Sequence, residues 1–238
     1  MNAPGARALR LALVGMGKMG RAVAALAPER DFAVVATLGR TAGAGAITRA
    51  ALAGADVAVE FTEPASAADN VLACVAAGCP VVVGTTGWYD RLPDVAAEVA
   101  RRNGAVVWAP NFSIGVNLFL RLASDAARTM TGAPFDAHVI ETHHAAKKDA
   151  PSGTAQAIVR VLSEGLGREV PVTSVRTGYV PGTHDVVFDA PFEQIRLEHA
   201  ARDRRVFAEG ALAAARWVVG RQGVFTMADV LSPGEARR

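Results

Sequence analysis

The sequence predicts an α/β fold in which a doubly wound parallel sheet is followed by a second, α+β domain with a mixed sheet. In the first half of the chain, short apolar runs alternate with helical segments of about ten residues, the pattern of strand–helix–strand units. The first apolar run ends directly at a glycine cluster, at residues 15–20. After Asn111 a long amphipathic helix precedes several short extended segments, which indicates a second domain.

The apolar runs of the first domain are short and rich in β-branched residues, which is typical of buried strands. We expect strands at residues 9–14, 32–38, 57–61, 80–83 and 105–108. Between them we expect helices at residues 20–27, at 66–75 with Ser66 as the N-cap, and at 93–103. Parallel neighbours need crossover helices, and these helices should therefore cover both faces of the sheet.

The second domain is predicted to begin with a helix at residues 116–130 and a strand at 135–141. A helix around residues 155–164 should follow, with extended segments at residues 172–179, 185–189, 194–199 and 205–208. A helix at residues 210–219 and a short terminal segment close the chain. We expect residues 1–112 and 205–238 to bind a dinucleotide, and residues 113–204 to bind substrate and to oligomerise.

The composition excludes several classes of protein. Hydrophobic residues make up 51% and charged residues 20%, as in globular enzymes and unlike disordered chains. A net charge of +2 is too small to indicate a nucleic-acid partner, and no apolar run approaches the roughly 18 residues of a membrane span. The N-terminus lacks the apolar stretch of a signal peptide, and Cys74 and Cys79 are expected as buried, reduced thiols. These features predict a cytoplasmic protein.

The glycine cluster has the spacing G-x-G-x-x-G and lies between a predicted strand and a predicted helix, as a dinucleotide-binding (Rossmann-like) loop requires. The first glycine permits the tight turn, the second lets the backbone approach a pyrophosphate, and the third lets helix and strand pack closely. The alternative is a purely structural turn. The residues expected to hold the cofactor here are Gly15, Met16, Gly17, Lys18, Met19 and Gly20.

The residues after the second predicted strand indicate which cofactor is used. Enzymes specific for NAD usually place Asp or Glu there to bind the ribose 2′-hydroxyl. This chain has Gly39 and Arg40 instead, which favours the 2′-phosphate of NADPH, with NADH as the alternative cofactor. Arg40 could also be a solvated loop cation.

The segment from Glu141 to Thr154, ETHHAAKKDAPSGT, concentrates reactive side chains. The chain has only three lysines, two of which are here, and all five histidines lie between His138 and His199. Histidines and lysines that are partly buried can titrate near neutrality, and a Pro-Ser-Gly-Thr turn into a helix can bind a carboxylate. A metal site is the competing interpretation, but adjacent histidines are an unusual ligand spacing and no third ligand is evident, so we expect no metal. A solvated basic loop is the other alternative.

HHAAKKDAPSGT resembles the signature of the dihydrodipicolinate reductase (4-hydroxy-tetrahydrodipicolinate reductase) family. Three further blocks agree with it: VEFTEP at residues 59–64, VGTTG at 83–87 and APNFSIGVN at 109–117. The resemblance runs in order from about residue 9 to about residue 231. It implies a cytoplasmic NAD(P)H-dependent oxidoreductase of the diaminopimelate route of lysine biosynthesis, acting on a small dicarboxylate and assembled as a homotetramer.

The resemblance also implies roles for individual residues. His143 and Lys147 correspond to the catalytic proton donors, and the substrate contacts correspond to His144, Ser152, Gly153, Thr154 and Arg204. Loops around the cofactor correspond to Phe61, Thr62, Gly84, Thr85, Thr86, Ala109, Pro110, Asn111 and Phe112. In such a reductase the ring substrate loses water, and a hydride then adds at ring carbon 4.

Three departures from the family pattern concern the cofactor side. The glycine loop is one residue shorter than usual, Glu60 replaces an aspartate, and residues 41–55 are short and rich in Gly and Ala. Two other functions share part of the pattern. An amino-acid or sugar-acid dehydrogenase would share the first 110 residues but would not need the histidine–lysine segment. A regulator that only senses NADPH would be expected to have a degraded segment there, whereas this one is intact.

Overall fold

The computed structural model describes residues 7–39 and 43–232. The chain divides into two compact units, one formed by Met1–Ile114 with Phe207–Arg238 and the other by Gly115–Val206. Each unit has its own sheet, with one core on each face of the sheet in the first unit and a single core in the second. Among the described residues, no helix is long and apolar enough to cross a bilayer.

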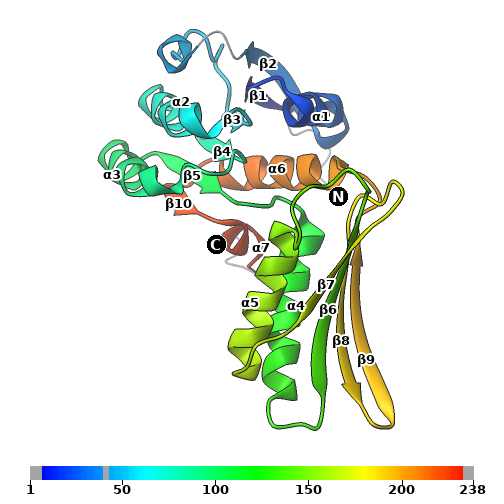
Figure 1. Ribbon diagram of the computed structural model, residues 1–238. Helices are drawn as coiled ribbons and strands as arrows, with labels where there is room; N and C mark the ends of the chain where they lie inside the picture. The colour runs from blue at the N-terminus through cyan, green and yellow to red at the C-terminus, as the bar shows by residue number, and fades with distance from the viewer. Residues whose placement is uncertain (1–6, 40–42, 233–238) are drawn as a thin grey trace. The chain divides into compact units, whose positions relative to one another are not determined.

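The first unit contains a six-stranded sheet in which every neighbouring pair is parallel (Figure 1). In spatial order the strands are β2 (Phe32–Leu38), β1 (Leu9–Val14), β3 (Val57–Glu60), β4 (Val81–Val83), β5 (Ala105–Trp108) and β10 (Gly223–Phe225). The parallel doubly wound sheet is therefore confirmed. β10 was not predicted, and it joins the edge of the sheet beside β5.

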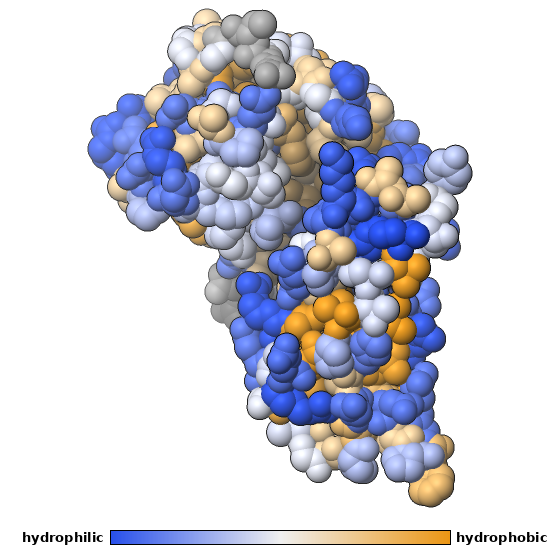
Figure 2. Space-filling model, in the orientation of Figure 1, coloured by the Kyte–Doolittle hydropathy of each residue, from blue (hydrophilic) through white to orange (hydrophobic). Residues whose placement is uncertain are grey.

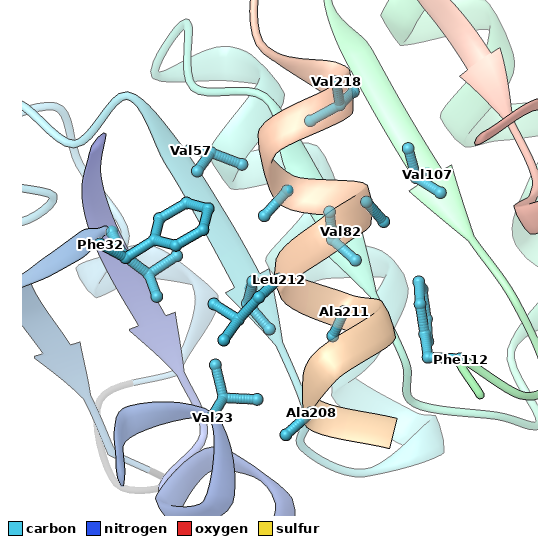
Figure 3. Packing of buried hydrophobic residues seen from close by; sticks show 14 of the residues in the cluster. Val23, Phe32, Val57, Val82, Val107, Phe112, Ala208, Ala211, Leu212 and Val218 are labelled. Carbon is cyan, nitrogen blue, oxygen red and sulfur yellow. The ribbon is translucent and has the colours of Figure 1, made fainter. Parts of the chain in front are cut away.

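Helices cover both faces of this sheet because successive residues of a strand point to opposite sides, and here the side chains on both sides are apolar. Leu11 and Leu13 belong to one core, and Ala12 and Val14 to the other. The helices are α1 (Lys18–Leu26) and α6 (Arg205–Val218) in the first core, with α7 (Met227–Leu231) beside them, and α2 (Pro64–Ala76) and α3 (Leu92–Arg102) in the second. Figure 3 shows Leu212 and its neighbours on α6 packed against side chains of the sheet, among them Phe32 of β2, Val57 of β3 and Val82 of β4.

The expectation of an extended segment at residues 205–208 was wrong, because these residues form the first turn of α6. Val206 and Phe207 have strand propensity, but Ala208, Ala211, Leu212 and Ala215 are buried at helical spacing. Gly210 is inside the helix. A Cβ there would lie 1.6 Å from the carbonyl oxygen of Phe112, so that the glycine permits a close approach of two segments. Packing has therefore overridden local propensity.

Other helix starts also differ from the prediction. The N-cap of α2 is Glu63 rather than Ser66, and Pro64 occupies the first turn, where its missing N–H costs nothing. α1 begins at Lys18, two residues earlier than expected. The glycine loop thus leads into the helix within the motif itself, and its later residues belong to the first helical turn.

The second unit has a four-stranded sheet, which is mixed as predicted (Figure 1). β6 (Asp136–His143) pairs in parallel with β7 (Val172–Arg176) and antiparallel with β8 (Thr183–Ala190), which pairs antiparallel with β9 (Glu193–Ala200). The helices α4 (Ile114–Met130) and α5 (Gly153–Leu166) share one core with the sheet. Phe119 and Leu162 belong to this core together with Val139 and Phe188.

β6 is longer than predicted and ends at His143 instead of Glu141. Its buried positions alternate, and they are Ala137, Val139, Glu141 and His143. The last two are polar, yet they point to the same side of the strand as the apolar pair. The end of β6 therefore places a carboxylate and an imidazole inside the protein.

Candidate active site

The cofactor loops predicted from the sequence all follow strands of the first sheet. Because the strands are parallel, their carboxyl ends lie at one edge, and the loops after them gather there. The glycine loop follows β1, Gly39 follows β2, and Phe61 follows β3. The loops after β4 and β5 carry Gly84, Thr85 and Thr86, and Ala109, Pro110, Asn111 and Phe112, respectively.

The glycine loop shows three different backbone environments. Gly15 has a φ of +94°, and a Cβ on it would lie 2.1 Å from the carbonyl oxygen of Phe61. A Cβ on Gly20 would lie 2.0 Å from the carbonyl oxygen of Gly15. At Gly17, the N-cap of α1, a Cβ would meet no atom within 4 Å among the described residues. The outer glycines therefore close the turn, whereas the middle one faces open space.

A cavity of about 200 Å³ opens at the ends of β1, β2 and β3. The strand order reverses between β1 and β3, which is the point where doubly wound sheets bind their ligands. Gly15, Met16, Gly17, Gly39, Phe61 and Thr62 are among its lining residues. Lys18 and Met19 are in the first turn of α1. Arg40, the residue expected to select the cofactor, lies outside the described residues.

The loops after β3, β4 and β5 contact one another. The backbone N–H of Thr62 donates to Thr85 Oγ1 over 2.7 Å, and a Cβ on Gly84 would lie 2.0 Å from the ring of Phe61. The ring of Phe61 also packs edge-on against that of Phe112, with centroids 6.3 Å apart. The blocks quoted from the sequence thus form one continuous surface.

Glu60, the last residue of β3, supports this surface from inside. Its side chain is fully buried and accepts hydrogen bonds from Thr62 Oγ1 and from Asn70 Nδ2. Burial raises the pKa of Glu60, and the hydrogen bonds from Thr62, Thr85 and Asn70 only partly oppose this effect. The sequence indicated Glu60 only as a departure from the family pattern, whereas the structure makes it the link between two cofactor loops.

In the second unit His143 ends β6, and it is 8% exposed. Its Nδ1 contacts Oε2 of Glu141, which lies two residues earlier on the same face of the strand. Burial lowers the pKa of His143, while the hydrogen bond and the charge of Glu141 raise it, and the charges of Lys147 and Arg176 lower it further. His143 therefore lies between a carboxylate and two cations.

Glu141 contacts two other elements although none of its surface is exposed. Its Oε1 accepts from Arg176 Nη2 at 2.6 Å, at the end of β7, and from the backbone N–H of Ser152 at 3.3 Å, at the start of α5. Burial opposes ionisation, but hydrogen bonds from Arg176, Ser174 and His143 outweigh it and lower the pKa of Glu141 to about 2. The carboxylate is thus ionised at neutral pH.

The start of α5 carries the predicted carboxylate-binding residues. Ser152 is its N-cap, and the Ser152 Oγ accepts from the backbone N–H of Ala155 at 3.1 Å. Gly153 and Thr154 are the first two helical residues, where the helix dipole favours an anion. The hydrogen bond between Ser152 N–H and Glu141 fixes this helix start beside His143.

The remaining predicted residues lie in loops of the same unit. His144 and Arg204 line a hollow of about 560 Å³ together with Gly178, Tyr179 and Pro181. The ammonium group of Lys147 is held by both oxygens of Asp149, at 2.7 and 2.8 Å. This structure therefore shows Lys147 in an ion pair.

Sequence reasoning assigned no role to Glu141, Arg176, His184 or His199. The ring of His184 lies 5.2 Å from that of His143 and 6.4 Å from that of His199. Burial, with the charges of His143 and His199, lowers the pKa of His184 to about 4. The confinement of all histidines to residues 138–199 was the available signal, but their convergence depends on the pairing of β6, β8 and β9.

Glu141, His143 and His184 have potential metal-ligand atoms within 4.8 Å of one another. A cation there would have to share Glu141 with Arg176, whose guanidinium is already bound to Oε1. Glu141 Oε2 is likewise taken by His143. The carboxylate therefore works as a hydrogen-bond acceptor within the protein, and the expectation of a metal-free site stays a prediction.

Two family models match this chain, and the second of them extends from the second unit into α6, β10 and α7 of the first. The model described as "Dihydrodipicolinate reductase, N-terminus" matches residues 9–112, and that described as "Dihydrodipicolinate reductase, C-terminus" matches residues 115–231. Together they span nearly all of the residues that the structure describes.

Curated relatives agree with the family models. The 4-hydroxy-tetrahydrodipicolinate reductase of Thiobacillus denitrificans is 39% identical, with 94% of this chain and 98% of that protein covered. The protein of the same name from Christiangramia forsetii is 33% identical over the same shares of both chains. The solved structure of a dipicolinate-bound dihydrodipicolinate reductase from Paenisporosarcina sp. TG-14 has a TM-score of 0.81 at 21% identity, covering 94% of this chain and 99% of that one. This last likeness supports the fold.

Proposed function

The chain belongs to the dihydrodipicolinate reductase family, and we propose that it reduces 4-hydroxy-tetrahydrodipicolinate, through dihydrodipicolinate, to tetrahydrodipicolinate with NAD(P)H. This reaction is a step of the diaminopimelate route of lysine biosynthesis. The doubly wound unit alone would support only a nucleotide-binding enzyme, since many dehydrogenases share it. The second unit supports the specific reaction, because the family match extends across it.

The observation that carries the proposal is the junction of His143, Glu141 and the start of α5. A group that can exchange a proton is hydrogen-bonded to a carboxylate, and the same carboxylate holds the helix start that suits an anion. A cyclic imine dicarboxylate needs both functions, a proton at the ring and binding of its carboxylate groups.

The first unit fits a nicotinamide dinucleotide. The open space at Gly17 lets a pyrophosphate approach the backbone at the start of α1, and the tight contacts at Gly15 and Gly20 keep the loop in that shape. Bound there, the cofactor supplies the hydride. The residues of the loops after β3, β4 and β5 would position its nicotinamide half.

In the second unit, Ser152, Gly153 and Thr154 would bind one carboxylate of the substrate at the helix start. His144 and Arg204 would bind the ring and the remaining negative charge from the hollow that they line. His143, in its protonated form, would donate the proton that balances the hydride added at ring carbon 4. Lys147 would serve as the second proton donor, exchanging Asp149 for the substrate as its partner.

The experiment that tests this function is a coupled assay. Dihydrodipicolinate synthase generates the unstable substrate in place, and the absorbance of NADPH at 340 nm reports its oxidation. The proposal predicts NADPH consumption that needs both this protein and the synthase product. Consumption at the background rate by a correctly folded protein would contradict it.

For the cofactor, we propose a preference for NADPH over NADH. Gly39 occupies the position where a carboxylate would repel a 2′-phosphate, and Arg40 follows it. A guanidinium can pair with that phosphate through charge-assisted hydrogen bonds.

For the assembly, we propose a cytoplasmic homotetramer in which the small sheets of neighbouring chains meet. β7 and β9 are edge strands, and open edges favour pairing with other chains. Large apolar side chains are exposed on and beside these strands, among them Val175, Tyr179, Phe192 and Ile195. Figure 2 shows apolar side chains gathered on one face of the second unit.

A further inference from the structure

Glu141 is a buried carboxylate in the second unit that contacts His143, Arg176 and Ser152. One of its oxygens accepts from Arg176 Nη2 at 2.6 Å and from the backbone of Ser152 at 3.3 Å, while the other faces His143 Nδ1. All of this occurs at a side chain with no exposed surface, where a hydrogen bond is electrostatically stronger than in water. We propose that Glu141 and Arg176 are positioning residues, which together set the tautomer and the proton affinity of His143.

The tautomer follows from the chemistry of the pair. An ionised carboxylate can only accept hydrogen bonds, so the contact with Glu141 requires a proton on Nδ1 of His143. The second nitrogen, Nε2, is then the atom that gains or loses a proton. Gly182, with a φ of +152°, packs against this nitrogen so closely that a Cβ on it would lie 2.9 Å from Nε2, and any larger residue would crowd the atom. Nε2 is therefore the nitrogen available for chemistry.

Charged and titratable groups face His143 from four sides. Glu141 comes from its own strand, Arg176 from β7, His184 from β8 and Lys147 from the loop after β6. His184 adds no positive charge at neutral pH, because its pKa is lowered to about 4. Asp149 binds the ammonium group of Lys147 and so offsets part of its charge. Lys147 and Arg176 both disfavour a positive charge on His143, and Arg176 also binds the Glu141 carboxylate directly.

Glu141 and Arg176 act on His143 in opposite directions. Glu141 favours the imidazolium through its hydrogen bond and its negative charge. Arg176 disfavours the imidazolium directly, and it also competes for the carboxylate by holding Oε1. Removing Glu141 should therefore lower the pKa of His143, whereas removing Arg176 should raise it. A merely structural pair would show no such opposition.

The test uses the full chain in two neutral variants, Glu141→Gln and Arg176→Gln. Histidines labelled with ¹³C at Cε1 are titrated by NMR, and the His143 signal is identified by its loss in His143→Gln. We expect the midpoint of the His143 titration to fall in Glu141→Gln and to rise in Arg176→Gln, each by about one pH unit, which is typical of the loss of a single nearby charge. The limb of the kcat/KM–pH profile that reports His143 should move in the same directions. In Glu141→Gln, kcat at neutral pH should fall about tenfold or more while NADPH affinity stays constant.

Arg168→Gln is the matched control. This variant also breaks an ion pair between an arginine and β6, the pair of Arg168 with Asp136. Both side chains are exposed, and Asp136 is at the opposite end of β6 from His143. Both readouts should keep their wild-type values in this variant. If Glu141→Gln fails to fold, the rise expected in Arg176→Gln still decides the matter. Unchanged midpoints, or shifts of the same sign in both variants, would overturn the proposal.

The inference rests on the proposed function, but the two can fail separately. The NMR titration needs no substrate and no turnover. Opposed shifts in an inactive wild-type protein would leave the positioning role intact and reject the reductase. If the wild-type protein is an active reductase but neither variant shifts the midpoint of the His143 titration, the proposed function stands and the positioning role is rejected.

Discussion

Nδ1 of His143 contacts Oε2 of Glu141 within a single strand and on a single face of it. Residues two apart in a strand share a face, so the tripeptide Glu-Thr-His places a carboxylate beside an imidazole wherever it is extended. β6 continues to His143, and the pair is therefore buried with the core residues Ala137 and Val139. The proton-exchanging group of the proposed reaction is held by the strand.

The first prediction concerns the two proposed proton donors. His143→Gln and Lys147→Ala should each lower kcat by about two orders of magnitude, a typical effect of losing a positioned acid. NADPH affinity should stay constant, since both residues lie in the second unit, outside the glycine loop. Steady-state kinetics with fluorescence titration of NADPH checks both values. Near-wild-type turnover in both variants would reject the assigned roles.

A second prediction separates cofactor binding from stability in the glycine loop. In Gly17→Ala the new methyl group meets no protein atom within 4 Å among the described residues, so the free energy of unfolding should change little. The same methyl would stand where the pyrophosphate approaches, and NADPH should bind about tenfold or more weakly. Calorimetric titration and urea unfolding measure the two effects. Gly45→Ala, at a second open position, is the control and should alter neither.

Cofactor choice gives a third prediction. The pairing of Arg40 with a 2′-phosphate should contribute on the order of 1.5–3 kcal/mol, a preference for NADPH of about tenfold to a hundredfold. Arg40→Ala should remove most of that preference, and Arg49→Ala, an exposed arginine nearby in the sequence, should retain it. The ratio of kcat/KM values for the two cofactors is the readout. Equal kcat/KM values for NADPH and NADH in the wild-type protein would contradict this prediction but would not affect the proposed reductase activity.

The buried His184 predicts a dependence of stability on pH. Its pKa is lowered from 6.5 to about 4, so the folded protein binds fewer protons than the unfolded chain between these values. The resulting stabilisation is present above pH 6.5 and is lost as the pH falls towards 4. It amounts to on the order of 3 kcal/mol. Urea unfolding at several pH values gives the free energy of unfolding as a function of pH. Between pH 4 and 6.5 this free energy should change less steeply with pH in His184→Gln than in the wild-type protein. Equal slopes for the two proteins would show that His184 does not cause the pH dependence.

The proposed assembly makes the fifth prediction. Light scattering at micromolar concentration should give a mass about four times the 24.7 kDa of one chain. The physical reason is the pair of open sheet edges, β7 and β9, with apolar side chains on and beside them. A fully active monomer at that concentration is the result that this proposal does not allow.

Much of the first sheet could be predicted because its signals are local. Residues 9–14, 32–38 and 105–108 form strands with the predicted bounds, since each is a mostly apolar run followed within two residues by Gly or Pro. β10 has only three residues and α7 only five, too few to show a period. Residues 205–208 have strand propensity, but their burial pattern belongs to α6.

The candidate site was predictable where it lies within one motif and not where it depends on strand pairing. The segment from His143 to Thr154 was recognisable from its residues. Glu141 could have been found from its i,i+2 relation to His143, once β6 was extended by two residues. Arg176 is 35 residues further along the chain and reaches Glu141 only because β7 pairs with β6, with His143 opposite Arg176.

In the proposed reaction, this chain transfers a hydride from a reduced nicotinamide to ring carbon 4 of the dicarboxylate substrate. The direct test is one turnover with NADPH deuterated at the transferring position of its nicotinamide, followed by mass spectrometry and NMR of the tetrahydrodipicolinate formed. We expect one deuterium per molecule of product, located at ring carbon 4. If the product carried no deuterium with NADPH labelled on one face of the nicotinamide, and none with NADPH labelled on the other face, the proposed hydride transfer would be contradicted.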